Sequence, residues 1–248
     1  MKIIRLLLLT GFVFAGSLKA QTTDEIIANH LKAIGSLDAW RAFSSIRYTG
    51  SSKWGNFDIP FVQVSMKDGS NRNDVTIQGL KMITAYDAKT GIGWSINPFQ
   101  GSKDAQKMNE EEIQSNKENG ELAGDLACYK ERNWKVEQLG KDDVDGVECF
   151  KIMLTKASGS VSYYYIDTQT WYIIKVGTKV KYQDREFEGE TQYSDFQTVN
   201  GVVIAFSTDN MANGQLQGQS VYTKVEFNVE IPAADFVMPE KKKEEEKK

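Results

Sequence analysis

The sequence predicts a mainly β protein of the α+β class, built on one strongly curved antiparallel sheet or unclosed β-barrel of about ten strands with a few short helices. Three observations support this fold class. Apolar and polar residues alternate with a period of two over most of residues 45–229. Short turns rich in Asp, Asn and Gly separate the alternating segments. No crossover helix lies between most of them, so consecutive strands are expected to pair as a meander.

Two short helices are expected before the sheet. Residues 22–25 read Thr-Thr-Asp-Glu, which is the spacing of a capping box. An apolar stripe over residues 26–34 follows, and Gly35 is placed to end the helix. Ser36 is suited to cap a second short helix that contains Trp40.

The strands follow from the change of period at Ser45. Turn sequences such as 68–71 (Asp-Gly-Ser-Asn) and the Asn-Gly pair at 200–201 are typical of hairpins. The expected strand segments are 45–49, 62–67, 75–77, 80–86, 94–96, 134–136, 148–154, 161–166, 171–182, 187–196, 202–207 and 221–229.

The segment 103–132 interrupts this pattern. It is polar and rich in Glu, Lys and Asn, and a thin apolar stripe runs through it at helical spacing. We interpret it as one or two short helices that lie on the sheet. The alternative is a solvated loop with a frayed helix.

The chain divides into three regions. Residues 1–20 have a positive start, a short apolar run and Ala20 before a cleavage position, which is typical of a secretory signal peptide. Residues 21–239 are expected to form a single domain. Residues 240–248 are almost all Lys and Glu and are expected to be disordered.

Charge and residue inventory exclude several classes of function. Removal of the signal peptide takes three basic residues and no acids from a chain of net charge −4, which leaves −7. An acidic exported protein is a poor nucleic-acid ligand. Two cysteines and one histidine are too few for a Cys/His zinc site, and we expect no metal and no cofactor. No GxSxG motif or nucleophile–base pair is present, so we expect no enzyme and no catalytic residue.

Two features keep alternatives open at this level. Cys128 and Cys149 can form a disulfide in an oxidising compartment, or they can be two buried free thiols. The apolar side chains on the curved sheet can line a ligand cavity or pack a dry core. His30, the one histidine, lies beside the apolar stripe of the first helix, and we interpret it as structural.

Several stretches carry a family resemblance: DEIIANHLKAIGSLDAWRAFSSIRYTG, GIGWSINPFQGSKDAQKMNEEEI, YKERNWKVEQLGKDDVDGVECFKIML, YYYIDTQTWYIIK and VEFNVEIPAADFVMP. Together they resemble periplasmic outer-membrane lipoprotein-sorting proteins, which are similar to the LolA and LolB carriers. The resemblance covers almost all of residues 21–239. It implies an unclosed β-barrel with helices over its mouth and concave face, located in the periplasm, that holds the acyl chains of lipids or lipoproteins.

The resemblance also implies partners and site residues. The partners are acyl chains and membrane-bound donor or acceptor proteins, and the carrier is expected to be a monomer. No lipobox cysteine is present, which departs from the anchored LolB acceptor. The inward-facing cavity residues, inferred from alternation, are Tyr48, Val62, Val64, Met66, Val75, Ile77, Ile152, Tyr164, Ile174 and Val176. The lid residues are Ile27, Leu31, Trp40, Met108 and Leu126.

Two functions therefore stay open. The first is a periplasmic carrier of lipid or lipoprotein acyl chains, which needs no catalyst because burial of each CH₂ supplies about 0.8 kcal/mol. The second is a non-catalytic envelope sensor or protein-interaction module on the same fold. A filled core would favour the second function.

Overall fold

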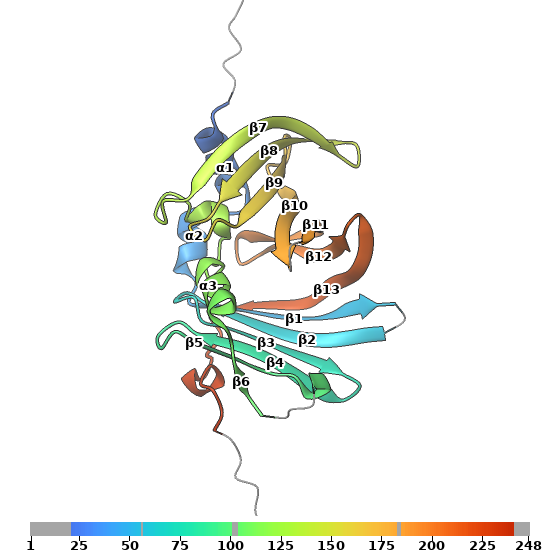
Figure 1. The fold of residues 1–248 in the computed structure, drawn as a ribbon. Helices are drawn as coiled ribbons and strands as arrows, with labels where there is room; N and C mark the ends of the chain where they lie inside the picture. Colours follow the sequence, from blue (N-terminus) through green and yellow to red (C-terminus); the bar gives the residue numbers. More distant parts are fainter. Residues whose placement is uncertain (1–20, 56, 101–103, 183–184, 241–248) are drawn as a thin grey trace, which may run out of the picture.

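The computed structural model describes residues 21–55, 57–100, 104–182 and 185–240. They form one 13-stranded sheet with the order β6-β5-β4-β3-β2-β1-β13-β12-β11-β10-β9-β8-β7. The sheet curls strongly but does not close, and its edge strands β6 and β7 lie far apart (Figure 1). The expected signal peptide, residues 1–20, and all but the first residue of the expected tail, 240–248, lie outside the described residues.

Most strands are between seven and fifteen residues long, and all pairs are antiparallel. Their bounds are β1 Ser45–Trp54, β2 Phe57–Met66, β3 Asn71–Ile77, β4 Leu80–Asp87, β5 Ile92–Ile96, β6 Gln106–Lys107, β7 Lys135–Val144, β8 Val147–Thr155, β9 Val161–Asp167, β10 Ile173–Tyr182, β11 Arg185–Val199, β12 Val202–Ala212 and β13 Gln215–Phe227.

The topology consists of two meanders that meet in the middle of the sheet. The first strand, β1, pairs with the last, β13, so we call β1–β6 the N-terminal arm and β7–β13 the C-terminal arm. The chain passes from the edge of one arm to the edge of the other through residues 108–134. The predicted curved antiparallel sheet is confirmed, with thirteen described strands instead of about ten. Short elements such as the two-residue β6 account for part of the difference, because they have no alternation to detect.

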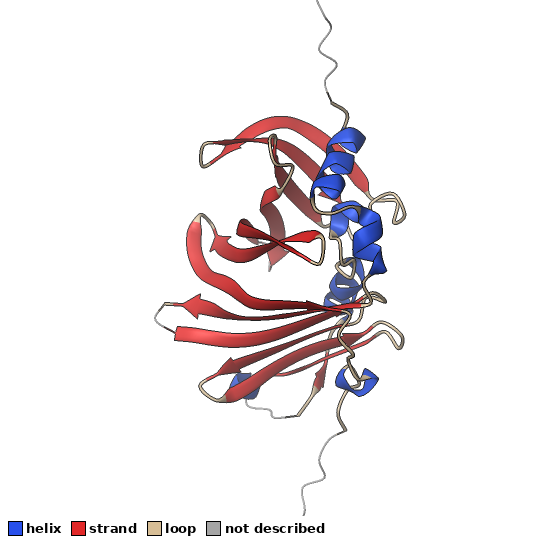
Figure 2. Ribbon diagram, turned by 180° about the vertical axis from the view of Figure 1, so that it is seen from behind, coloured by secondary structure: helices blue, strands red, loops and turns tan. Residues whose placement is uncertain are grey.

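The helices gather along one side of the curved sheet (Figure 2). α1 (Thr23–Ala33) begins with the predicted capping box, and α2 (Leu37–Ala42) follows the Ser36 cap. α3 (Glu110–Glu118) has its own capping box from Asn109. Three 3₁₀ turns complete the set: η1 Pro98–Gln100, η2 Asp125–Ala127 and η3 Ala233–Asp235. The prediction of short helices within 103–132 therefore agrees with α3 and η2.

Gly35 allows the helical side to dock closely on the sheet. Its φ is +109°, and a Cβ at this position would lie 2.4 Å from the carbonyl oxygen of Gly201. Only glycine tolerates both conditions. The adjacent Ile34 carbonyl accepts a 3.0 Å hydrogen bond from the Val203 N–H, which ties the end of α1 to β12.

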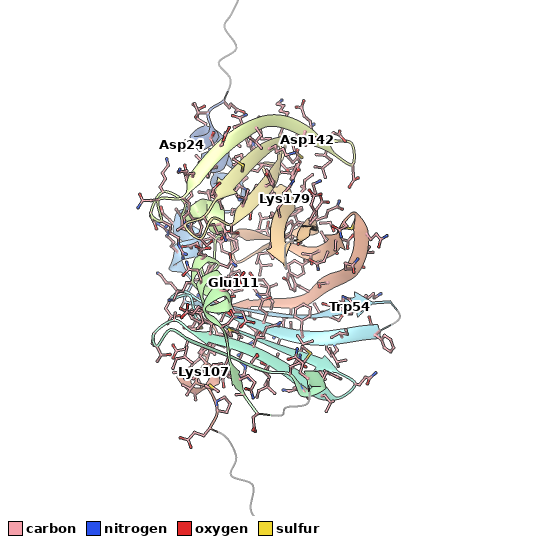
Figure 3. The ribbon with its side chains drawn as sticks, viewed as in Figure 1. Asp24, Trp54, Lys107, Glu111, Asp142 and Lys179 are labelled. Atoms are coloured by element: carbon pink, nitrogen blue, oxygen red, sulfur yellow. The ribbon has the colours of Figure 1, made fainter. Side chains whose placement is uncertain are left out.

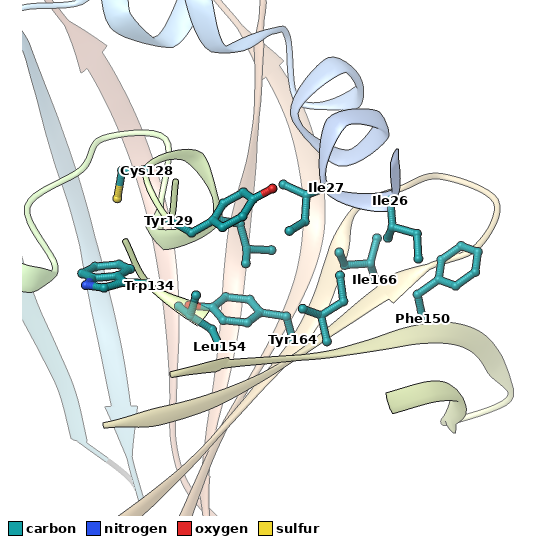
Figure 4. Close-up of a cluster of buried hydrophobic side chains, with 11 residues drawn as sticks. Ile26, Ile27, Cys128, Tyr129, Trp134, Phe150, Leu154, Tyr164 and Ile166 are labelled. Carbon is teal, nitrogen blue, oxygen red and sulfur yellow. The ribbon is translucent and has the colours of Figure 1, made fainter. Parts of the chain in front are cut away.

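The C-terminal arm buries its concave face. Ile26 and Ile27 of α1 pack on side chains of β8 and β9, and Tyr129 and Trp134 close the cluster (Figure 4). Full burial of each such aliphatic side chain contributes about 1.5–3 kcal/mol. The sheet side of this cluster consists of Phe150, Ile152, Leu154, Tyr164 and Ile166.

The N-terminal arm buries its convex face instead. Directly paired positions across β2–β5 form the row Val64, Arg72, Ala85 and Trp94. The C-terminal segment 232–238, which contains η3, covers this row. Trp94 Nε1 donates a 2.8 Å hydrogen bond to the Phe236 carbonyl, and Arg72 Nη1 donates a 2.6 Å bond to the Asp235 carbonyl. The two arms therefore pack their cores on opposite faces of the same sheet.

Candidate ligand cavity

A cavity of about 1390 Å³ lies within the curve of the sheet. Residues from α1, α2 and α3, from the concave faces of both arms and from the loop before η2 line it. This volume exceeds the roughly 300–1,000 Å³ of an ordinary small-molecule pocket. The curvature therefore leaves a large space that the side chains do not fill. Figure 3 shows two of the lining residues, Glu111 on α3 and Lys179 on β10.

One part of the lining is apolar. It lies under the helices and along the C-terminal arm, where the core of that arm continues into the cavity wall. An open space against such side chains favours a ligand with hydrocarbon surface, because that surface leaves water on binding. The apolar and aromatic lining residues are Ile34, Trp40, Ile46, Tyr48, Met66, Leu122, Ala123, Leu126, Tyr164, Ile173, Val176, Tyr193, Phe196, Val203, Ile204, Ala205 and Tyr222.

The wall from the N-terminal arm is polar. Gln63 and Ser65 of β2 line the cavity together with Asn71 and Asn73 of β3. These residues are paired across the two strands, Gln63 with Asn73 and Ser65 with Asn71, so they form one continuous patch. The cavity thus presents a hydrocarbon-compatible wall on one side and an amide- and hydroxyl-rich wall on the other.

A polar network attaches the segment 118–125 to the C-terminal arm at the cavity. Lys156 is 6% exposed, and its ammonium lies 2.8 Å from Asp125. The same carboxylate accepts a 2.8 Å hydrogen bond from the Tyr164 hydroxyl, and Lys156 also donates to Asn119. Such buried pairs are costly to break, because the group that remains loses its partner. This network fixes the loop between α3 and η2 over one side of the cavity.

Glu118 adds a second attachment beside the first. Its carboxylate accepts hydrogen bonds from the Ser158 N–H, the Ser158 hydroxyl and Gln114. Burial acts to raise the pKa of Glu118, but the hydrogen bonds from Ser158 and Gln114 outweigh it and lower the pKa. The carboxylate is therefore a charged acceptor that holds the end of α3 against the β8–β9 turn.

His30 is a neutral part of the cavity wall. Its Nδ1–H donates a 2.8 Å hydrogen bond to the Trp171 carbonyl. Burial lowers the pKa of His30 to about 4, against a smaller opposing effect of that hydrogen bond. No carboxylate or nucleophile among the described residues is hydrogen-bonded to the ring. This surrounding agrees with the structural role expected for His30.

The structure places four of the ten predicted cavity residues in the lining: Tyr48, Met66, Tyr164 and Val176. Val75 and Ile77 share the concave face of β3 with the lining residue Asn73, but they lie further along the strand. Ile152 is fully buried in the core under α1. These three side chains therefore lie outside the cavity wall.

The remaining three predicted cavity residues require a correction. Val62 and Val64 alternate with the lining residues Gln63 and Ser65, which places them on the convex face. Ile174 packs on the convex side of the other arm. A one-residue change of register reverses every side chain of a strand, and apolar alternation alone does not say which face is concave.

The predicted lid residues also separate. Trp40 and Leu126 line the cavity. Ile27 is buried in the core of the C-terminal arm, and Leu31 packs against the clusters of α1 and α2. Met108 contacts Gly93 and accepts a hydrogen bond from Asn116, outside the cavity lining.

Both cysteines are free and buried. Cys128 lies in the cluster under α1, whereas Cys149 lies with Val144 and Tyr165 on the other face of β8. The sheet separates the two sulfurs, so the structure has the free-thiol alternative and not the disulfide. Burial raises the pKa of each thiol to about 11, which keeps both protonated at neutral pH.

Some lining residues were not predicted from the sequence. The largest group comes from β11–β13 and includes Tyr193, Thr208 and Tyr222. The alternation in 187–196 and 221–229 was the available signal for it. The Asp125–Lys156 pair had no signal, because nothing in the sequence connects a loop residue with a strand-end residue at that separation.

Two further tests concern other kinds of site. None of the helices in the described ranges is long and apolar enough to cross a membrane. Within those ranges no group of three or more His, Cys, Asp or Glu side chains is arranged to hold a metal ion.

Comparison with known proteins identifies the fold. No protein-family model matches the sequence, and no curated protein matches it. Three solved structures are similar in fold. A DUF1329 family protein from Desulfovibrio piger has a TM-score of 0.58 at 12% identity, with 86% of this chain and 96% of that chain covered. A LolA superfamily protein from Nitrosomonas europaea has a TM-score of 0.57 at 10% identity, with 88% and 98% covered.

The third structure is described as an outer membrane lipoprotein-sorting protein domain from Vibrio parahaemolyticus. Its TM-score is 0.56 at 10% identity, with 86% of this chain and 94% of that chain covered. At these identities the similarity concerns the fold. The chain therefore has a LolA-like fold, in agreement with the resemblance found in its sequence.

Proposed function

We propose that this protein is a periplasmic carrier that binds the acyl chains of lipids or lipoproteins in its cavity and takes part in lipoprotein transport to the outer membrane. The observation that carries this proposal is the unfilled cavity of about 1390 Å³ with an apolar wall. A filled core would favour the sensor or interaction module, and the space inside this sheet is not filled.

Energetics supports an acyl ligand. A dry apolar void loses dispersion contacts, and water inside it finds few hydrogen-bond partners on the apolar side. A hydrocarbon chain recovers both losses, at about 0.8 kcal/mol for each buried CH₂. The polar wall of Gln63, Ser65, Asn71 and Asn73 then accommodates whatever polar group the chain carries. Binding and release need no chemical step, so the carrier is not an enzyme.

Location and partners follow from the same proposal. The signal peptide expected in residues 1–20 exports the chain, and the net negative charge suits a free periplasmic protein better than one that binds anionic surfaces. Membrane-bound donor and acceptor proteins would load and unload the cavity. The carrier acts as a monomer.

The test is a binding experiment on the exported protein. Lipids that co-purify from the periplasm are identified by mass spectrometry, and the emptied protein is titrated with the neutral dye Nile red and with a monoacylglycerol competitor. We expect stoichiometric acyl lipid in the purified protein and competitive displacement of the dye. A lipid-free protein that binds neither probe would make the interaction module the better function.

A pair of variants locates the binding. Thr208 lines the cavity, whereas its neighbour Ser207 does not. We expect Thr208→Trp to fill part of the space and weaken probe binding at least about tenfold, which corresponds to about 1.4 kcal/mol. Ser207→Trp adds the same side chain to the other face of β12 and should retain binding.

A further inference from the structure

Three tyrosines from different strands bring hydroxyl groups into the cavity. Tyr48 of β1, Tyr193 of β11 and Tyr222 of β13 all line it, and the rings of Tyr48 and Tyr222 lie 4.9 Å apart. None of the three hydroxyls has a hydrogen-bond partner among the described residues. In contrast, the hydroxyl of the neighbouring Tyr164 is bound to Asp125.

These hydroxyls face open space. No buried side-chain nitrogen or oxygen in the described part of the chain lacks a hydrogen-bond partner. The three unpaired hydroxyls must therefore be accessible, and the space that their residues line is the cavity. Protein hydroxyls without a partner inside an enclosed site are available donors for a bound ligand.

The cationic groups of the cavity, by contrast, already have partners. Each of the three lies close to a carboxylate: Arg72 at 2.6 Å from Asp74, Lys156 at 2.8 Å from Asp125 and Lys179 at 3.1 Å from Glu188. None of these cations is therefore left to neutralise an anionic ligand.

The acidic lining strengthens this bias against anions. Four carboxylates, Glu111, Glu118, Glu121 and Asp125, line the cavity against those three cations. Burial raises the pKa of Tyr193 to about 12, and the negative charge of Asp125 adds to the rise. The potential at this hydroxyl thus disfavours a second negative charge, which includes the carboxylate of a free fatty acid.

We propose that the hydroxyls of Tyr48, Tyr193 and Tyr222 form a recognition site for an uncharged acyl carbonyl, so that the cavity selects ester- or amide-linked acyl chains over free fatty acids. The inference rests on the proposed carrier function and names its ligand class. A tyrosine O–H donates to a carbonyl oxygen, which satisfies both groups inside the cavity. A carboxylate in the same place would stay charged without a cation, at a cost of several kcal/mol.

The experiment compares two probes that differ in the head of the same chain. Palmitate and 1-monopalmitoylglycerol are titrated at pH 8, below their aggregation limits, against Nile red bound to the emptied full-length exported protein. We expect the ester to compete at least about tenfold better than the acid. In the triple variant Tyr48→Phe, Tyr193→Phe, Tyr222→Phe the ester should lose about 2- to 10-fold in affinity for each hydroxyl that bonds it, while Nile red binding stays within about twofold.

Tyr172→Phe is the matched control. Tyr172 packs on Phe196 with ring centroids 4.8 Å apart and does not line the cavity, so its variant should keep the ester preference. Equal competition by acid and ester, or an ester preference that survives the triple variant, would overturn the inference and leave the carrier function intact. Failure of both probes to displace the dye would overturn both.

Discussion

The two arms of the sheet use the same alternation for opposite purposes. In the C-terminal arm the concave row Ile152, Tyr164 and Val176 is apolar. The convex row beside it contains Lys151 and Lys175, whose ammonium groups lie over the ring of Tyr165 at 5.0 and 4.3 Å. This arm therefore follows the expected pattern, with hydrocarbon inside the curve and charge outside.

In the N-terminal arm the pattern is reversed. The concave row Gln63, Asn73, Thr84 and Ser95 is polar across four strands. The convex row that contains Trp94 is apolar and lies under the C-terminal segment 232–238. A strand in a sheet needs only one buried face, and the segment that covers it decides which face that is. The difference explains how one cavity obtains one apolar and one polar wall.

The largest expected effect tests the convex core of the N-terminal arm. Trp94 is 1% exposed, so Trp94→Ala should lower the free energy of unfolding by about 3–5 kcal/mol, since it removes both packing and the hydrogen bond to Phe236. Trp54, which is 62% exposed at the tip of the β1–β2 hairpin (Figure 3), is the control. Trp54→Ala should cost less than about 1 kcal/mol. Urea titration of both variants gives the comparison.

Equal costs for the two tryptophans would contradict the convex core. The C-terminal segment would then not be the cover that makes this arm stable, and the reversal between the arms would lose its physical basis.

The next effect concerns His30, at the junction of the C-terminal arm with α1. Its pKa is lowered to about 4 in the folded protein, below its ordinary 6.5, so the unfolded chain binds more protons between these values. Stability from this group is therefore fully present above pH 6.5 and is lost as the pH falls toward 4. At 1.36 kcal/mol per pKa unit the loss is about 3 kcal/mol.

The measurement is the free energy of unfolding of the wild type and of His30→Gln at several pH values between 7.5 and 4.5. Other acids titrate in both proteins, so the difference between the two curves isolates His30. A difference that does not change with pH would mean that this imidazole accepts a proton in the folded state at its ordinary pKa.

The smallest expected effect sharpens the contrast between the two cavity walls. Gln63→Leu with Asn73→Leu turns the polar wall apolar without filling the convex core. We expect a change of less than about 1 kcal/mol in stability and a several-fold gain in Nile red affinity, because more apolar surface meets the probe. Val62→Leu, on the convex face and 37% exposed, should leave the affinity unchanged. A gain of similar size in both proteins would show that the dye does not report on the cavity.

Local signals predicted the elements well. Thr22 with Glu25, Gly35 and Ser36 each act where the sequence indicated, because capping and positive φ depend on a few adjacent residues. The alternation of period two likewise identified most strands, and short hairpin turns made a meander the economical topology. The interpretation of residues 103–132 as short helices on the sheet also agrees with α3.

The facing of side chains was predicted only in part. Tyr48, Tyr164 and Val176 reached the cavity wall, whereas Val62 and Val64 lie on the convex face. Both valines follow the same alternation as any core strand. Their burial depends on residues 232–238, which are far away in the chain, and no local pattern contains that contact.

By itself, the sequence determined the class of this protein: a curved antiparallel sheet with capped helices at its start, because propensity, capping and hairpin turns act over a few residues. Only the tertiary structure decided which face of each arm is buried, that Cys128 and Cys149 lie on opposite sides of β8, and that Tyr48, Tyr193 and Tyr222 share one cavity. These outcomes depend on the curvature of the whole sheet and on the segments that cover it. Both arise from contacts between residues that are distant in the chain.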